Sequence, residues 1–102
     1  MFLARVIGHV VATRKDPQMI GGKLLILRPM LVDDQDPSKF RPGMNTVVAV
    51  DRLGAGEGDL VLLAQGSSAR RTEGLGDMPI DAAVTGIVDC VSVSGNQLFN
   101  AD

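Results

Sequence analysis

The apolar positions of this chain fall in short runs, rich in valine, isoleucine and leucine, that glycines, prolines and charged residues interrupt. Runs of this length with such breaks are typical of β-strands. They predict five strands, at 2–13, 23–32, 44–52, 59–65 and 85–93, and short helical turns around 67–71 and 79–83. So many strands with so little helix predict an all-β fold, a small OB-like antiparallel β-barrel.

Length and breaks set the expected domain organisation. The 102 residues are enough for one domain with its own core and too few for two, so we expect a single domain over residues 1–102. The polar segment 33–43 contains two prolines and is expected to be a mobile loop. Residues 94–102 are expected to be a short tail that begins with a Gly-Asn turn. Pro29 has no N–H, which restricts the second strand to an edge position or a bulge.

Three of the predicted strands carry apolar residues on both faces. In an isolated antiparallel barrel, each strand should alternate between apolar residues that face inward and polar residues that face outward. Continuous apolar runs instead occupy 24–27, 47–50 and 60–64. A chain of this size has little mass with which to cover the outer faces, although scattered apolar surface is common on small domains. We therefore expect other subunits to cover these faces.

Composition and charge exclude several classes of protein. Apolar residues make up 45% of the chain and charged residues 22%, as in a globular domain. The net charge of -2 gives no electrostatic attraction to nucleic acid or to an anionic membrane. The lone cysteine, Cys90, excludes an internal disulfide and fits a reducing cytosol. The first residues predict a strand rather than a signal peptide or a membrane span.

Gly54, Gly56 and Gly58 form a cluster that raises the question of a phosphate-binding loop. Such loops place their glycines between a strand and a helix, whose N–H groups point at the phosphate. Here no lysine follows the last glycine, Glu57 and Asp59 would repel a phosphate, and the next residues predict a strand. We therefore interpret the three as turn glycines, which supply positive φ or let another backbone approach closely.

Candidate catalytic and metal-binding residues are few. His9 and Cys90 are the only histidine and cysteine, so one chain cannot supply the usual set of zinc ligands. Ser67 or Ser68 with His9 suggests a triad, but the chain has no Gly-x-Ser-x-Gly elbow. The acidic residues at 33–36 lack the glycine and the distal glutamate of a calcium loop. We expect no catalytic residue, no metal and no cofactor.

Several blocks of the sequence, taken together, resemble one known family. They are VIGHVVATRKDP, a Lys-Leu-Leu strand with Pro29, VVAVDRLGAGEGDLVLLAQGSSAR and PIDAAVTGIVD, and they extend from Met1 to about Val93. This combination is similar to the vertex proteins of bacterial microcompartments, the family of the carboxysome and ethanolamine-utilisation shell pentamers. The resemblance implies an OB-like barrel and a cyclic homopentamer without catalytic activity. It also implies a cytoplasmic location, at the corners of a polyhedral shell whose facets are hexameric shell proteins.

The resemblance also suggests a role for the segment Ser67-Ser68-Ala69-Arg70. Small residues with polar donors suit close contact near a subunit boundary, and an arginine can bind a carboxylate across that boundary. Candidate acceptors on the neighbouring subunit are Asp51, Glu57 and Asp59. The alternative is that Ser67 or Ser68 is simply the N-cap of a helical turn.

Two other classes of function remain open on the residues alone. One is an OB-type binding module for nucleic acid or oligosaccharide. The three phenylalanines, with no tyrosine or tryptophan, offer such a module little stacking surface. The other is a small enzyme, which lacks a candidate base beyond His9. The mass in solution separates the classes, because a shell vertex protein is expected to contain about five subunits.

Overall fold

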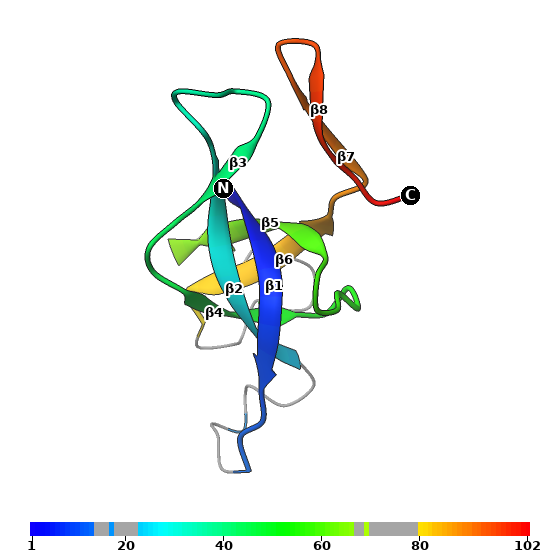
Figure 1. Cartoon of the computed structure of the whole chain (residues 1–102). Helices are drawn as coiled ribbons and strands as arrows, with labels where there is room; N and C mark the ends of the chain where they lie inside the picture. The colour runs from blue at the N-terminus through cyan, green and yellow to red at the C-terminus, as the bar shows by residue number, and fades with distance from the viewer. Residues whose placement is uncertain (14–16, 18–22, 67–68, 70–79) are drawn as a thin grey trace.

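The computed structural model describes residues 1–13, 17, 23–66, 69 and 80–102 (Figure 1). The regular elements among these residues are β-strands, and no α-helix occurs among them. The strands are β1 (Phe2–Val10), β2 (Lys23–Val32), β3 (Phe40–Pro42), β4 (Val47–Asp51), β5 (Leu60–Gln65), β6 (Ala82–Ile87), β7 (Cys90–Val93) and β8 (Asn96–Asn100).

Five of these strands close into a barrel. The order is β1-β5-β6-β4-β2, and β1 pairs back with β2 to complete the circle. The pairs around the circle are antiparallel except β4–β6, which is parallel. This five-stranded barrel is the OB-like fold that the sequence predicts. Closure leaves no unpaired sheet edge in the barrel itself.

The barrel interior is filled by small and branched aliphatic side chains that alternate along the strands. The buried members of this cluster, which we call the barrel core, are Ala4, Val6, Leu25, Leu27, Ala49, Ala55, Val61, Leu63, Ala82 and Val84. Within each strand these residues occupy every second position, because successive side chains of a β-strand point to opposite faces and one face is turned inward. Burying one leucine or valine side chain completely contributes about 1.5–3 kcal/mol. Leu27 and Leu63 are fully buried, so the barrel core is the main source of stability in the chain.

A second, smaller cluster lies on the outer side of the barrel wall. Its buried members are Val50, Ala69, Ile80 and Ala83, with Leu24 packed against them. Val50 and Ala83 are paired across the parallel β4–β6 contact. The chain therefore covers part of the outer apolar surface itself. The expectation that other subunits cover the outer faces is too broad here, because Ala69 and Ile80 of the same chain are buried against this part of the wall.

Two elements extend beyond the barrel at the same end of the molecule (Figure 1). β3 pairs with the last residues of β2, Met30 to Val32, and forms a short ribbon. β7 and β8 pair only with each other among the described strands, in a C-terminal hairpin. Pro29 lies where β2 has already left β4, since that pairing ends at Leu27. The predicted edge position of the strand is nevertheless wrong, because β2 pairs with β1 on one side, where Pro29 is opposite Ala4, and with β4 and β3 on the other. The proline is tolerated because it needs no N–H at this point, and its carbonyl accepts the Gly43 N–H at 2.7 Å.

The sequence-based expectation for the last strand was wrong. Residues 85–93 do not form one strand, because β6 begins at Ala82 and ends at Ile87, and β7 begins at Cys90. The N–H of Val88 donates to the Leu60 carbonyl at 2.8 Å, which anchors the point where the chain leaves the barrel. The expected tail 94–102 contains β8. The turn is Ser94-Gly95, with φ of 50° and 81°, as a two-residue hairpin of the primed type requires.

Two further expectations need correction. Segment 33–43 is not wholly irregular, because it contains β3 and the N–H of Asp33 donates to the Lys39 carbonyl at 3.1 Å. The turn expected around 79–83 is extended at Ala82 and Ala83, which pair with Gln65 and Ala64 of β5. The ladder there overrides the helical preference of alanine. For the turn around 67–71, Gly66 and Ala69 have 3₁₀ conformation and the other residues lie outside the described part.

Candidate assembly surfaces

The loop between β4 and β5 is organised by the carboxylate of Asp51. This side chain is 2% exposed, and its two oxygens accept the N–H groups of Leu53 and Ala55 at 2.9 and 2.8 Å. Ala55 thereby reaches the barrel core, where its side chain is fully buried. A carboxylate that accepts two backbone N–H bonds in a buried site is an internal loop cap. Asp51 therefore has almost no surface to offer to a neighbouring subunit.

The glycines of this loop act as turn residues. Gly54 and Gly58 have φ of 88° and 91°, a region that side chains with a Cβ rarely adopt, whereas Gly56 has no positive φ. The Gly58 N–H donates to the Val6 carbonyl at 2.9 Å, and that of Gly56 to an Asp59 carboxylate oxygen at 2.9 Å. Gly54 and Gly58 thus have the positive φ that the turn interpretation of this cluster includes, and Gly56 does not. The loop's N–H groups point inward at its own acceptors, and β5 rather than a helix follows.

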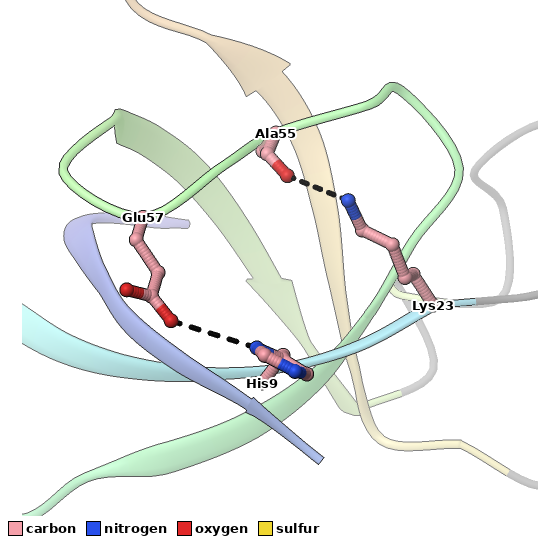
Figure 2. Close-up of polar contacts among 4 residues, drawn as sticks. All are labelled: His9, Lys23, Ala55 and Glu57. Atoms are coloured by element: carbon pink, nitrogen blue, oxygen red, sulfur yellow. Dashed lines mark hydrogen bonds and ion pairs between the residues drawn. The ribbon is translucent and has the colours of Figure 1, made fainter. Parts of the chain in front are cut away.

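A hollow of about 400 Å³ opens beside this loop, at the end of the barrel opposite the hairpin. Figure 2 shows its polar rim, in which His9 Nδ1 lies 3.5 Å from a Glu57 carboxylate oxygen. On the other side, Lys23 Nζ donates to the Ala55 carbonyl at 3.0 Å. His9 and Glu57 are more than 60% exposed, so this ion pair contributes at most about 1 kcal/mol. The ammonium group of Lys23 and the carboxylate of Glu57 therefore each have a partner within the chain, the Ala55 carbonyl and the His9 ring respectively.

A second hollow, of about 220 Å³, lies beside the outer cluster and is lined by Leu24, Val48 and Ile80 among others. Val48 is 51% exposed on the outer face of β4, directly opposite Ile26 of β2. The apolar runs of the sequence thus do reach the surface here. An exposed patch of this kind is typical of a protein that associates with others.

The sequence-predicted interface residues have different positions. Ser67, Ser68 and Arg70 lie outside the described residues. Ala69 is fully buried in the outer cluster of its own chain. Glu57 is exposed, and Asp59 is half-buried with one oxygen bound to the Gly56 N–H. Asp51 ends β4, and Glu57 and Asp59 follow it in the loop that leads to β5.

Sequence reasoning missed the residues that extend from the end of the barrel. Leu31 is 42% exposed and Met44 is 94% exposed, on either side of β3. Phe99 of β8 lies over Arg5 of β1, with 5.6 Å between the guanidinium carbon and the ring centroid. The sequence did contain a signal for β7, the alternation of apolar and polar residues from Val91 to Val93. The predicted strand 85–93 included these residues, so β7 was not recognised as a separate strand.

The described residues contain no group of three or more histidine, cysteine or acidic side chains placed to hold a metal ion. Over the same part of the chain, no helix has the length and apolar character needed to cross a membrane. The carboxylate of Asp36 has a lowered pKa, mainly because the side chain of Ser38 donates a hydrogen bond to it and also because the Ser38 N–H does. These hydrogen bonds close a turn within segment 33–43.

Comparison with known proteins gives a consistent result. The family model described as "Ethanolamine utilisation protein EutN/carboxysome" matches residues 1–89. The chain is 50% identical over 92 residues to the bacterial microcompartment shell vertex protein PduN of Salmonella typhimurium, covering 90% of this chain and 99% of PduN. The match to the family model ends at Asp89, one residue before β7.

Solved structures agree with the sequence comparison. The structure of Gloeobacter violaceus CcmL superimposes with a TM-score of 0.84 at 40% identity, covering 99% of this chain and 98% of that one. The GrpN pentameric microcompartment shell protein from Rhodospirillum rubrum superimposes with a TM-score of 0.75 at 41% identity, covering 91% and 98%. These matches confirm the resemblance predicted from the sequence. The chain belongs to the EutN/CcmL family of microcompartment shell vertex proteins.

Proposed function

We propose that this chain assembles into a cyclic pentamer that closes the vertices of a polyhedral bacterial microcompartment, and that its role is structural. The observation that carries the proposal is the 50% identity to a shell vertex protein across 99% of that protein's length. The pentameric GrpN structure supports the subunit number. The alternative of an OB-type binding module for nucleic acid or oligosaccharide finds no relative among the matches described above.

Geometry gives a physical reason for such a role. Tiles with six-fold symmetry alone produce a flat sheet, so a closed polyhedral shell needs points of five-fold symmetry. A head-to-tail contact between two different surfaces of one subunit generates a ring when the rotation closes. The exposed apolar side chains outside the barrel core, such as Val48 and Leu31, supply surface for contacts of this kind. We propose that the rim of the ring contacts hexameric shell proteins of the facets.

The proposed absence of catalysis also has support in the described residues. Asp51, Asp59 and Val6 accept hydrogen bonds from four N–H groups of the β4–β5 loop, which are therefore not free to stabilise a reacting oxyanion or a phosphate; the donors are Leu53, Ala55, Gly56 and Gly58. His9 is mostly exposed and faces an acidic partner. In the cell, this proposal places the chain in the shell of a microcompartment within the cytoplasm.

The test is the mass of the assembly, measured by native mass spectrometry and sedimentation at micromolar concentration. The expected species contains five subunits of 10.7 kDa. A second step mixes the chain with hexameric shell proteins and images the products by electron microscopy. Closed shells should form with the chain, and open sheets or tubes without it. A protein that stays monomeric at these concentrations, or that binds an oligonucleotide as a monomer, contradicts the proposal.

A further inference from the structure

The β7–β8 hairpin is attached to the barrel at its base only. The Ala101 N–H closes the base by donating to the Asp89 carbonyl at 2.9 Å. The contact to the barrel wall is the Phe99 ring over Arg5. Beyond that point the hairpin extends away from the strands of the barrel (Figure 1). A two-stranded hairpin on its own is at best marginally stable in water, so an arm of this kind needs something to pack against.

The two faces of the hairpin differ in polarity. Val91 is opposite Phe99, and Val93 shares their face two residues further along β7, where its partner across a bulge in the ladder is the exposed Asn96. The three apolar side chains are half-buried, and none belongs to the barrel core or to the outer cluster. On the other face, Ser92 is opposite Gln97, and both are exposed. The hairpin therefore presents an apolar face that the described part of its own chain covers incompletely.

The β2–β3 ribbon extends from the same end of the barrel, on the other side of it (Figure 1). Leu31 and Arg41 are opposite each other in the ladder, so their side chains share one face of the ribbon. Leu31 is 42% exposed, and Arg41 is exposed. β3 pairs with β2 along one edge, and no described strand pairs with its other edge. The ribbon thus combines an exposed apolar side chain, a cation and an open edge.

The charges of the two elements are complementary. Residues 88–102 carry two acidic side chains, Asp89 and Asp102, and no basic one, and both acids are exposed. Arg41 is the only charged residue of β3. The positive charge is confined to the paired part of the ribbon, because the turn between β2 and β3 holds the acids Asp33, Asp34 and Asp36 and one base, Lys39. Asp33 and Asp36 accept hydrogen bonds from the N–H groups of Gln35 and Ser38 in that turn. Complementary charges at the rim of an apolar contact favour one orientation of docking.

We propose that the β7–β8 hairpin of one subunit packs on the β2–β3 ribbon of the next subunit around the ring. The inference rests on the proposed pentamer and names the two surfaces that meet in it. The hairpin and the ribbon are different surfaces of the same chain, as a head-to-tail contact requires. Val91 and Val93 cover Leu31, while Asp89 or Asp102 lies near Arg41. Each subunit gives its hairpin to one neighbour and receives a hairpin from the other.

The experiment removes one surface at a time. Val93→Asp damages the hairpin face, Leu31→Asp damages the ribbon, and Ser92→Asp places the same charge on the polar face of the hairpin as a control. The concentration at which the pentamer dissociates is measured by sedimentation and native mass spectrometry. We expect this concentration to rise at least tenfold for Val93→Asp and Leu31→Asp, and less than threefold for Ser92→Asp. Far-UV circular dichroism of the dissociated variants verifies that the barrel is folded.

Mixing the two damaged variants tests the head-to-tail geometry directly. At a concentration where each variant alone is monomeric, the mixture retains one intact contact, between the hairpin of the Leu31→Asp subunit and the ribbon of the Val93→Asp subunit. We expect dimers of twice the 10.7 kDa subunit mass and no closed ring. A mixture that remains monomeric overturns the proposal, because hairpin-to-hairpin contact or docking on a facet protein leaves no intact contact in it.

A gentler variant covers the case in which Val93→Asp does not fold. Val93→Thr keeps the branched shape and the strand preference and changes only the polarity. We expect its dissociation concentration to rise about threefold above that of the parent. A parent-like value for this folded variant overturns the proposal and leaves the pentamer intact. If the parent protein itself is monomeric, the proposed function fails, and the two failures are therefore distinguishable.

Discussion

The barrel and the β7–β8 hairpin use the same antiparallel pairing, yet different forces hold them. In the barrel, every strand has a neighbour on both sides, and the inward side chains of all five strands form one core. In the hairpin, each strand has one neighbour, and its apolar side chains belong to neither cluster. Backbone pairing alone therefore does not distinguish the stable region from the dependent one. Side-chain burial does.

The largest expected effect comes from the barrel core. Leu63→Ala should lower the free energy of unfolding by about 2–5 kcal/mol, because it removes a fully buried side chain and leaves a cavity. Val91→Ala in the hairpin should cost less than about 1 kcal/mol when measured on the dissociated subunit. Urea denaturation gives both values. Equal losses would mean that the hairpin is part of the cooperative core and that the comparison fails.

Asp51→Ala tests how strongly the β4–β5 loop belongs to the barrel. The substitution leaves the N–H groups of Leu53 and Ala55 without their acceptor, at an expected cost of about 1–3 kcal/mol in the free energy of unfolding. Asp59→Ala is the matched control, because its half-buried carboxylate accepts one of these loop N–H bonds rather than two. Thermal unfolding should show the larger shift for Asp51. A smaller shift for Asp51 than for Asp59 would contradict the role of the buried cap.

A pair of glycines in the same loop separates backbone strain from side-chain crowding. Gly58→Ala forces a Cβ into positive φ and should cost about 1–2 kcal/mol in the free energy of unfolding. Gly56→Ala should be close to neutral, because Gly56 has no positive φ and nothing lies within 4 Å of the added Cβ. Nothing lies near the added Cβ at Gly58 either. A neutral Gly58→Ala, measured by denaturant titration, would remove strain as the reason for this glycine.

Phe99→Leu should have a small effect on the isolated subunit. It keeps an apolar side chain on the hairpin and removes the ring that lies over Arg5, a contact worth about 0.5–1 kcal/mol at an exposed site. Hydrogen exchange should show faster opening of the hairpin with unchanged protection in β1 and β5. Loss of protection throughout the barrel would show that the hairpin base supports the whole fold.

The smallest effect is local and depends on pH. Because hydrogen bonds from Ser38 lower the pKa of Asp36, the turn they form is stabilised above the ordinary Asp range, near pH 4, and this stabilisation is lost as the pH falls through the lowered pKa. NMR of the Ser38 amide should report the opening of this turn on acidification while barrel amides stay unchanged. In Asp36→Asn the Ser38 signal should no longer titrate. A simultaneous change in the barrel would contradict the separation of the two regions.

The fold was predictable where the pattern of apolar side chains and the conformational preferences of the backbone indicate the same structure. The strands at 23–32 and 59–65 were close to correct, because their apolar runs end at clear breaks. Gly54 and Gly58 were predictable as turn residues, since the loop must reverse between two strands. The break at Val88 was missed although Gly86 and Asp89 are residue types that strands disfavour, because the valines and isoleucine around them favour β-structure. What changes there is the pairing partner, and that depends on the closed barrel rather than on local preference.

The candidate surfaces were harder to predict than the fold. Asp51 looks in the sequence like an acid at a strand end, and its burial depends on Ala55 folding back into the barrel core. Apolar runs indicated which strands reach the surface, but Val50 is covered by Ala69 and Ile80 while Val48 is left exposed. Two residues on the same face of β4, two positions apart, thus have different surroundings. Whether each valine is covered depends on where Ala69 and Ile80 pack, and these residues lie far from β4 in the sequence.

The position of β6 has a consequence for the order of events during synthesis. β6 lies between β4 and β5, both of which leave the ribosome before it. Until residue 87 has been made, these two strands each have an open edge, and the sheet cannot close. Contacts between distant parts of a chain form slowly, and exposed edges in that interval favour wrong pairings. Closure of the barrel therefore waits for β6, whereas the hairpin, whose strands pair only with each other among the described strands, takes no part in that closure.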